Sequence, residues 1–325
     1  MCSAAGARSR VRRWSSIMAL VVSVVATVAS LVGWRSSPPL HDALLRPPSA
    51  ADYHSLLVAA SDGPSILLAT HRGVFRLADD SGHWRRSGLR GSDVVALARD
   101  QGGRLWAAGH LVLATSRNDG RTWSPRRPAG LPSLDVHALA AGAGRLYCLL
   151  ADGRLYASAD GRHFSPRQSG SLPDVAALAA TATNVLFAAD RSRGVLRLAP
   201  GQRRWRLLLR RQALSVALAG GRRIVAGTTR GVYVSTDAGR NWRRGKGVDA
   251  AVVAIVVRSP GPWLLLTATR RLYTSSHAGT SWQPAKIGAK HAHAVRRPAP
   301  SESLVALSSH GRGSVISPRR ASAVG

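Results

Sequence analysis

Short apolar runs of four to six residues recur along the chain from about residue 52 onward, and each is bounded by glycine, proline, aspartate or asparagine. Three such runs make up a repeat, and an aromatic residue follows them. Runs of this length between turn-forming residues predict strands rather than helices. The closing aromatic residues recur every 37 to 41 positions, at Trp84, Trp123, Phe164, Trp205, Trp242 and Trp282.

A fixed period of about 40 residues with about four strands per unit is typical of a β-propeller. Seven units fit residues 52–320, so we predict an all-β, seven-bladed β-propeller that closes into one ring. Closure matters because an open array would leave exposed sheet edges. The seventh unit lacks a clear closing aromatic, which places the seam of the ring there and leaves six or eight blades as alternatives. Residues 321–325 form a short tail.

The amino terminus differs from the repeats. Four arginines and no acidic residue precede an uncharged apolar stretch at residues 17–33, which is at the lower limit for crossing a bilayer. This charge distribution predicts a cytoplasmic N-terminus and an exported remainder, periplasmic or extracellular. We therefore predict that residues 1–35 are a signal peptide or a helical anchor in the cytoplasmic membrane, with cleavage and retention both open. The proline-rich residues 36–51 are predicted to be a linker.

The turn before the closing aromatic carries a shared motif. Residues 235–242, STDAGRNW, match the pattern S-x-D-x-G-x-x-W, and other repeats carry variants of it. The aspartate can accept backbone N–H bonds across its own turn, the glycine can adopt a positive φ, and the aromatic ring can pack between blades. We expect these residues to build turns rather than to act in catalysis or metal binding. They are Ser116, Asn118, Gly120 and Trp123; Asp160, Gly161 and Phe164; Ser235, Asp237, Gly239 and Trp242; and Ser275, Gly279 and Trp282.

The repeats resemble the BNR/Asp-box propellers, a superfamily that includes sialidases, the sortilin luminal domain and photosystem II assembly/stability factor-like proteins. The phrases GLPSLDV at residues 130–136, GSLPDV at 170–175 and GVYVSTDAGRNW at 231–242 are most similar to the assembly-factor branch. The resemblance covers residues 52–320. It implies a non-catalytic module for protein binding or assembly, with a sialidase-like glycoside hydrolase or a carbohydrate-binding propeller as the alternative.

The composition weighs against an enzyme. Glu302 is the sole glutamate, whereas ordinary glycosidases need two carboxylates, and the Arg-Ile-Pro motif that a sialidase resemblance implies does not occur. His291 and His293 could chelate a metal from one strand face, but no third ligand is evident. Cys148 lies in an apolar strand, which favours a buried, inert thiol. We expect no catalytic residues, no metal and no cofactor.

The charge points to a binding role. Lys and Arg number 46 against 16 Asp and Glu, which gives a formal net charge of +30. One set of arginines follows the closing aromatics, where charge protects exposed outer edges against aggregation. A second set lies in the turn between the second and third strands, and we predict that it projects from one face. This predicted basic face consists of Arg72, Arg154, Arg193, Arg230, Arg270 and Arg312.

A ring of guanidinium groups suits carboxylates or phosphates. The alternative is a turn preference whose charge is simply solvated. The predicted partners are an acidic protein surface or membrane complex, an anionic lipid or an acidic glycan. We do not expect a nucleic-acid partner, because the chain is predicted to be exported and carries no stacking aromatics beside these arginines. We expect a monomer.

Overall fold

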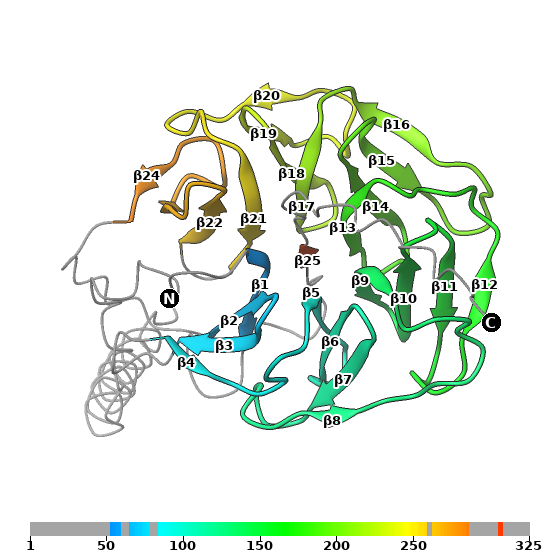
Figure 1. The fold of residues 1–325 in the computed structure, drawn as a ribbon. Helices are drawn as coiled ribbons and strands as arrows, with labels where there is room; N and C mark the ends of the chain where they lie inside the picture. Colours follow the sequence, from blue (N-terminus) through cyan, green and yellow to red (C-terminus); the bar gives the residue numbers. More distant parts are fainter. Residues whose placement is uncertain (1–52, 60–64, 78–83, 259–261, 286–304, 308–325) are drawn as a thin grey trace, which may run out of the picture. The chain divides into compact units, whose positions relative to one another are not determined.

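The computed structural model describes residues 53–59, 65–77, 84–258, 262–285 and 305–307, all within the unit Pro38–Gly325. Their regular structure is entirely β, as the sequence predicts, and forms six antiparallel sheets (Figure 1). The predicted signal or anchor segment, the linker and the tail lie outside the described residues. Among the described residues, no helix has the length and apolar character needed to cross a membrane.

Each blade consists of four strands that are consecutive in the sequence. Blades 1 to 3 are β1 (Tyr53–Ala59), β2 (Ser65–Thr70), β3 (Gly73–Leu77) and β4 (Trp84–Arg86); β5 (Val94–Arg99), β6 (Leu105–Gly109), β7 (Val112–Ser116) and β8 (Ser124–Pro125); and β9 (Val136–Gly142), β10 (Arg145–Leu150), β11 (Leu155–Ser158) and β12 (Ser165–Arg167). Blades 4 to 6 are β13 (Val175–Ala180), β14 (Leu186–Asp190), β15 (Gly194–Leu198) and β16 (Arg206–Leu209); β17 (Ala213–Ala219), β18 (Arg223–Thr228), β19 (Gly231–Ser235) and β20 (Arg243–Arg244); and β21 (Val252–Val256), β22 (Trp263–Thr267), β23 (Leu272–Ser275) and β24 (Gln283–Pro284).

The prediction of seven blades is wrong, because six blades close the ring. The first strand of each blade contacts the first strand of the next, and β21 of blade 6 contacts β1 of blade 1. No gap is left for a seventh blade. The strand expected within the seventh unit, β25 (Val305–Leu307), instead pairs antiparallel with β13, with Leu307 opposite Ala177. It lies at the centre of the ring and contacts the first strand of every blade (Figure 1).

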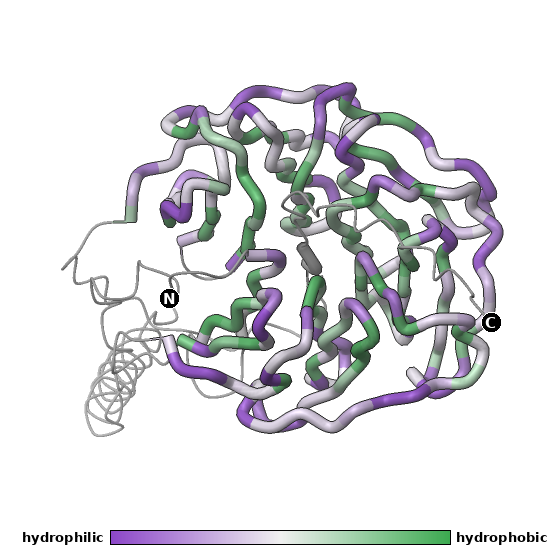
Figure 2. The backbone as a smooth tube through the Cα atoms, viewed as in Figure 1, coloured by the Kyte–Doolittle hydropathy of each residue, from purple (hydrophilic) through white to green (hydrophobic). Residues whose placement is uncertain are grey.

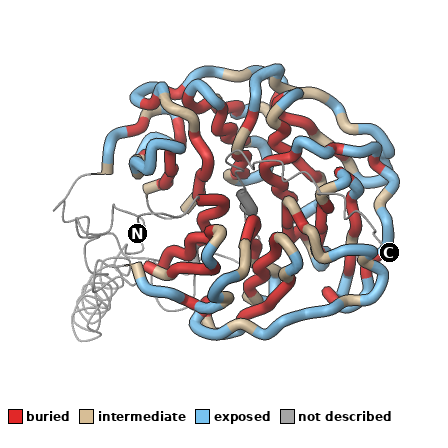
Figure 3. The backbone as a smooth tube through the Cα atoms, in the orientation of Figure 1, coloured by how far each residue is buried: buried red, intermediate tan, exposed pale blue. Residues whose placement is uncertain are grey.

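The core lies along the first strand of each blade, which is nearest the centre of the ring and is called the inner strand below. Every residue from Val175 to Ala180 is fully buried, as are Val94 to Ala98 (Figure 3). These strands read as nearly continuous apolar runs because each face of a blade packs on a neighbouring blade, and the hydropathy follows the same pattern (Figure 2). The fourth strand of each blade is short, and it is largely exposed except in β16, where Leu207, Leu208 and Leu209 are partly buried. Its arginines and prolines therefore lie at the outer edge, where the sequence predicts them.

A β-bulge recurs at the same place in all six blades. In blade 1, Tyr53 pairs with Thr70 and Ser55 with Ala69, so that one inner-strand residue has no direct partner. The first strand of each other blade also has one residue without a direct partner on the second strand. The skipped residues are His54, Val95, His137, Ala176, Leu214 and Val253. A bulge turns its side chain away from the regular alternation of the strand, so this position can present different chemistry in each blade.

Candidate functional site

The turns between the second and third strands of the blades lie beside the starts of the inner strands and make up one face, which we call the hairpin face. In each of blades 2 to 6, the residue after the second strand donates its backbone N–H to the carbonyl just before the inner strand, as from His110 to Asp93 at 3.1 Å. Each blade therefore contributes three equivalent positions to this face. They are the residue before the inner strand, the bulge residue and the residue after the second strand.

Five of the six predicted arginines lie on the hairpin face and are exposed; Arg312 lies outside the described residues. Arg154 pairs with Asp152 at 2.7 Å, which neutralises its charge locally and raises the pKa of the guanidinium. Arg270 stacks over the ring of Tyr53, 5.6 Å from its centroid. Within the described part of the chain, four of the five form no ion pair. These are Arg72, Arg193, Arg230 and Arg270.

The hairpin face also holds Arg191, an arginine that is absent from the predicted set. Arg191 follows β14 and donates from Nη1 to the backbone carbonyl of Val175 at 3.0 Å. Burial lowers the pKa of its guanidinium, while Asp174 and Asp190 act in the opposite direction. Arg191 is therefore held in place by the backbone, whereas the four exposed arginines lie in the turns and only Arg270 among them stacks on a ring of the described residues.

On blades 1 to 3 the hairpin face carries four imidazoles and two carboxylates, here called the His–Asp cluster. Asp93 Oδ2 lies 2.8 Å from His71 Nδ1, and Asp93 Oδ1 lies 3.5 Å from His54 Nε2. Asp135 Oδ1 lies 2.6 Å from His110 Nδ1 and 3.5 Å from His137 Nε2.

His110 links the two halves of the cluster, since its Nε2 lies 3.6 Å from Asp93 Oδ2. Both halves also join neighbouring blades. Asp93 of blade 2 meets two histidines of blade 1, and Asp135 of blade 3 meets His110 of blade 2.

Burial and charge shape this cluster. The His54 side chain is fully buried, and that of His137 is 17% exposed. Burial lowers the pKa of His137, Asp135 opposes this shift, and His110 and Arg191 reinforce it. His137 is therefore held toward its neutral form, which leaves a ring nitrogen able to accept a proton or a metal ion.

The His–Asp cluster was not predicted, since the sequence analysis expected no metal site and considered only His291 and His293, which lie outside the described residues. The signal becomes visible when the repeats are aligned on their inner strands. His54 and His137 share the bulge position, Asp93 and Asp135 share the position before the inner strand, and His71 and His110 share the position after the second strand. Residues that are distant in sequence are brought together because the six blades repeat one register.

The turns expected to be structural have the following contacts. The Asp237 carboxylate accepts the backbone N–H of Asn241 at 2.9 Å and the Ser235 hydroxyl at 2.8 Å, and Asn118 Oδ1 accepts the backbone N–H of Thr122 at 2.9 Å. Bonds to His163 hold the pKa of Asp160 well below its usual range.

In the four turns that begin at Ser116, Ser158, Ser235 and Ser275, the serine oxygen accepts the glycine N–H at 2.8 to 3.0 Å. Phe164 and Trp282 are buried, and Trp123 and Trp242 are partly buried. These turns lie at the opposite ends of the strands from the hairpin face.

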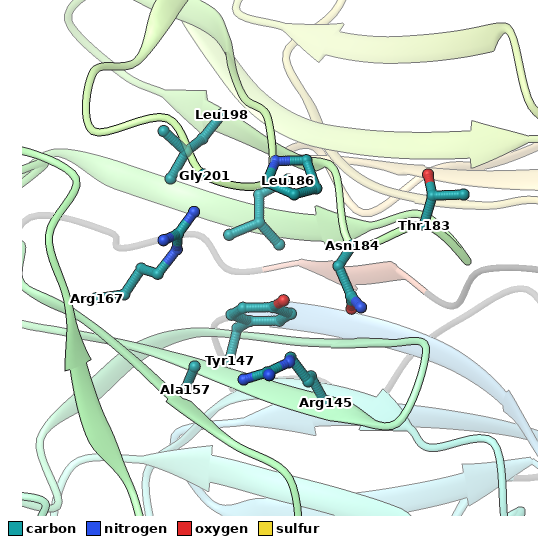
Figure 4. Close-up of a pocket in the computed structure, with 10 residues that line it drawn as sticks. Arg145, Tyr147, Ala157, Arg167, Thr183, Asn184, Leu186, Leu198 and Gly201 are labelled. Atoms are coloured by element: carbon teal, nitrogen blue, oxygen red, sulfur yellow. The ribbon is translucent and has the colours of Figure 1, made fainter.

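A cavity of about 280 Å³ lies between blades 3 and 4, toward the same end as these turns. Arg145, Tyr147 and Arg167 of blade 3 face Asn184 and Leu186 of blade 4 across it (Figure 4). Burial raises the pKa of the Tyr147 hydroxyl, and the two arginines oppose that shift. Cys148, its neighbour in β10, is fully buried, which raises the pKa of its thiol and makes it a poor nucleophile.

Comparison with known proteins supports the fold. Residues 89–207, which span blades 2 and 3 and most of blade 4, match the family model described as the DUF6242 beta propeller domain. No curated protein sequence matches the chain.

Among solved structures, YCF48 from Cyanidioschyzon merolae is 12% identical with a TM-score of 0.50, and the match covers 81% of this chain and 97% of that one. A structure of YCF48 bound to D1 peptide is 14% identical with a TM-score of 0.50, covering 82% and 96%. The gluconolactonase XC5397 from Xanthomonas campestris is 15% identical with a TM-score of 0.54, covering 82% and 88%. These similar structures include a protein solved with a bound peptide and a gluconolactonase, so they support the propeller fold and leave the activity of this chain open.

Proposed function

We propose that this chain is an exported, non-catalytic propeller that binds an acidic segment of a protein partner on its hairpin face. The observation that carries the proposal is the set of exposed arginines that four different blades project from the equivalent turn. In the described part of the chain these guanidinium groups have no carboxylate partner, so their charge is available to a ligand. Guanidinium groups bind carboxylates through paired hydrogen bonds, and clustered cations speed the approach of an acidic partner.

The contrast between the two ends of the hairpin face supports a peptide-like ligand. Blades 1 to 3 offer imidazoles and carboxylates together with Arg72, whereas blades 4 to 6 offer Arg193, Arg230 and Arg270. An extended ligand that crosses this face would meet cations along half of its length and mixed polar groups along the rest. YCF48, a structure of similar fold, has been solved with a bound peptide, which agrees with this use of a propeller.

The test replaces the four unpaired arginines together by glutamine: Arg72, Arg193, Arg230 and Arg270. We expect binding of a fluorescein-labelled decaglutamate peptide at low salt to weaken at least tenfold. Recovery of partner proteins from detergent-solubilised membranes should fall in parallel. The matched control replaces four exposed arginines on or next to the outer strands by glutamine: Arg85, Arg127, Arg206 and Arg243.

The control makes the same change in net charge, so we expect it to weaken binding by less than about twofold. Equal losses in the two variants would show a diffuse charge effect and contradict the proposed face. Binding to vesicles of phosphatidylglycerol but not to decaglutamate would identify a lipid surface as the ligand instead. Hydrolysis of a fluorogenic sialoside by the purified chain would support the sialidase-like alternative, which depends on Glu302, outside the described residues.

A further inference from the structure

The His–Asp cluster contains two sets of three side chains whose donor atoms converge. The first set is His54, His71 and Asp93, and the second is His110, Asp135 and His137. Within each set, one donor atom per residue lies within 4.8 Å of the others. In a tetrahedral site, two ligands that are each about 2.0 to 2.2 Å from the ion lie about 3.3 to 3.6 Å apart. Side-chain shifts of up to about 1 Å would therefore place an ion among the three donors of either set.

One oxygen of each carboxylate lacks a hydrogen bond among the described residues. Asp93 Oδ1 and Asp135 Oδ1 are buried and accept no hydrogen bond among the described residues. Asp135 Oδ1 lies 2.6 Å from His110 Nδ1, so this contact is close but lacks the alignment of a hydrogen bond. Burying a carboxylate oxygen without a donor is costly, and a bound cation at the same place removes that cost.

The chemistry of the donors selects the class of cation. Two imidazoles and one carboxylate suit Zn²⁺ and other divalent transition metals, whereas Ca²⁺ and Mg²⁺ prefer sites made of oxygen ligands. Three protein ligands also leave a coordination position open to solvent or to a ligand. His71, Asp93, His110 and Asp135 have side chains 23% to 37% exposed, so an ion can enter from solvent.

The backbone explains why these donors converge. The recurrent bulge turns His54 and His137 toward the hairpin face, where regular pairing would alternate their direction along the strand. The aspartate of each set lies directly before an inner strand, and a histidine that follows a second strand completes the set. Each set spans two neighbouring blades, so a bound ion would join blade 1 to blade 2 or blade 2 to blade 3.

We propose that these two sets are adjoining binding sites for divalent transition-metal ions, of which Zn²⁺ is the best match. The sites join blades 1, 2 and 3 on the hairpin face. They use different side chains from the arginine-mediated binding proposed above, although Arg72 directly follows His71 in the same turn of blade 1.

The experiment measures Zn²⁺ uptake by the full chain, without a histidine tag, after treatment with EDTA and equilibrium dialysis. We expect about two ions per chain, and one ion each in His71→Ala and His110→Ala. Both of these histidines are more than a third exposed, so their removal should leave the fold intact. Circular dichroism and melting in EDTA check this directly. Co²⁺ should give visible absorption bands in the wild type that weaken in each variant.

His163→Ala is the matched control. His163 pairs with Asp160 at 2.8 Å, and no third ligand joins them among the residues that the structure describes, so this variant should retain both ions. A second control, His291→Ala with His293→Ala, should also retain both. Uptake of one ion or none by the wild type would overturn the two-site assignment. It would also be overturned if His71→Ala and His110→Ala kept the wild-type stoichiometry, or if the His291 and His293 variant lost the metal.

Discussion

At the scale of single residues, the aspartates fall into two environments. Those in the turns before the closing aromatics accept backbone and side-chain donors from their own turn, as Asp237 does. Those before the inner strands, such as Asp93 and Asp135, face imidazole nitrogens across a blade boundary. The same residue type thus fixes local geometry at one end of a blade and joins two blades at the other end.

The turn environment predicts a specific pH dependence for Asp237. Hydrogen bonds from the backbone and side chain of Asn241, and from Ser235, lower the pKa of Asp237 to about 2. An unfolded aspartate titrates near about 3.9. The stabilisation is therefore present above pH ~4 and is lost as the pH falls through 2. Asp237→Asn should unfold at lower urea concentration than the wild type at pH 7, and the difference should shrink between pH 4 and pH 2.

Asparagine keeps the acceptor oxygen, because Asn118 makes the equivalent bond in blade 2. The Asp237→Asn variant therefore tests the charge rather than the shape of the turn. Asp249→Asn makes the same charge change at an exposed site that pairs with Arg244. A gap between wild type and Asp237→Asn that stayed constant from pH 7 to pH 2 would contradict the assignment, as would the same profile in the control.

At the scale of elements, each of these turns also packs against the preceding blade. The backbone at Gly161, with φ +70°, lies directly against the indole ring of Trp106 in β6 of blade 2. Gly120 approaches Leu67 of β2 in the same way, and Gly279 approaches Val225 of β18. The glycine therefore supplies both the turn conformation and the close approach between blades.

This double role predicts a large effect for Gly161→Ala. A methyl group at this position adopts a disfavoured φ, which costs about 1–2 kcal/mol, and overlaps the Trp106 ring, which adds about 1–3 kcal/mol. We expect a loss of about 2–5 kcal/mol in the free energy of unfolding, measured by urea denaturation. Gly170→Ala has the same φ of +70° with no atom within 4 Å of the new methyl group, and should cost only the backbone part of this, about 1–2 kcal/mol. Equal losses would show that the turn does not depend on contact with blade 2.

At the scale of the whole molecule, the sequence predicts the strands well and the number of blades poorly. Apolar runs between glycines mark strands such as β6 and β18 because local burial and turn chemistry determine them. The number of blades depends on the angle at which neighbouring sheets pack, and no local pattern encodes that angle. Residues 304–308 read as a strand of a seventh blade, yet Val305–Leu307 pair with β13 at the centre of the ring.

The His–Asp cluster was missed for a related physical reason. Its members lie on five different segments from His54 to His137, and only the common register of three blades brings them together. The exposed arginines were easier to predict, since arginine precedes glycine in the turn at Arg72, Arg193 and Arg230. A feature that lies within one local motif can be predicted from a single repeat. A site whose residues come from several blades can be predicted only when the arrangement of the blades in the ring is known.

The six-blade ring makes a prediction about the C-terminal part of the chain. Because β21 contacts β1 directly, the ring should stay closed when residues 286–325 are deleted. The deletion removes the pairing of β25 with β13, which joins three residue pairs, and about 1 kcal/mol per lost hydrogen bond gives about 2–3 kcal/mol in total. For a domain of this size the melting temperature should fall by about 5–10 °C while the transition stays cooperative.

Deletion of residues 321–325 alone is the control and should leave the melting temperature unchanged. Far-UV circular dichroism of the longer deletion should retain its β-sheet signal, and gel filtration should show a compact monomer. A chain that loses cooperative unfolding on removal of residues 286–325 would show that six blades cannot close without the seventh repeat. The contact between β1 and β21 would then be insufficient to seal the ring, and β25 would be an essential part of the fold rather than a strand added to a closed propeller.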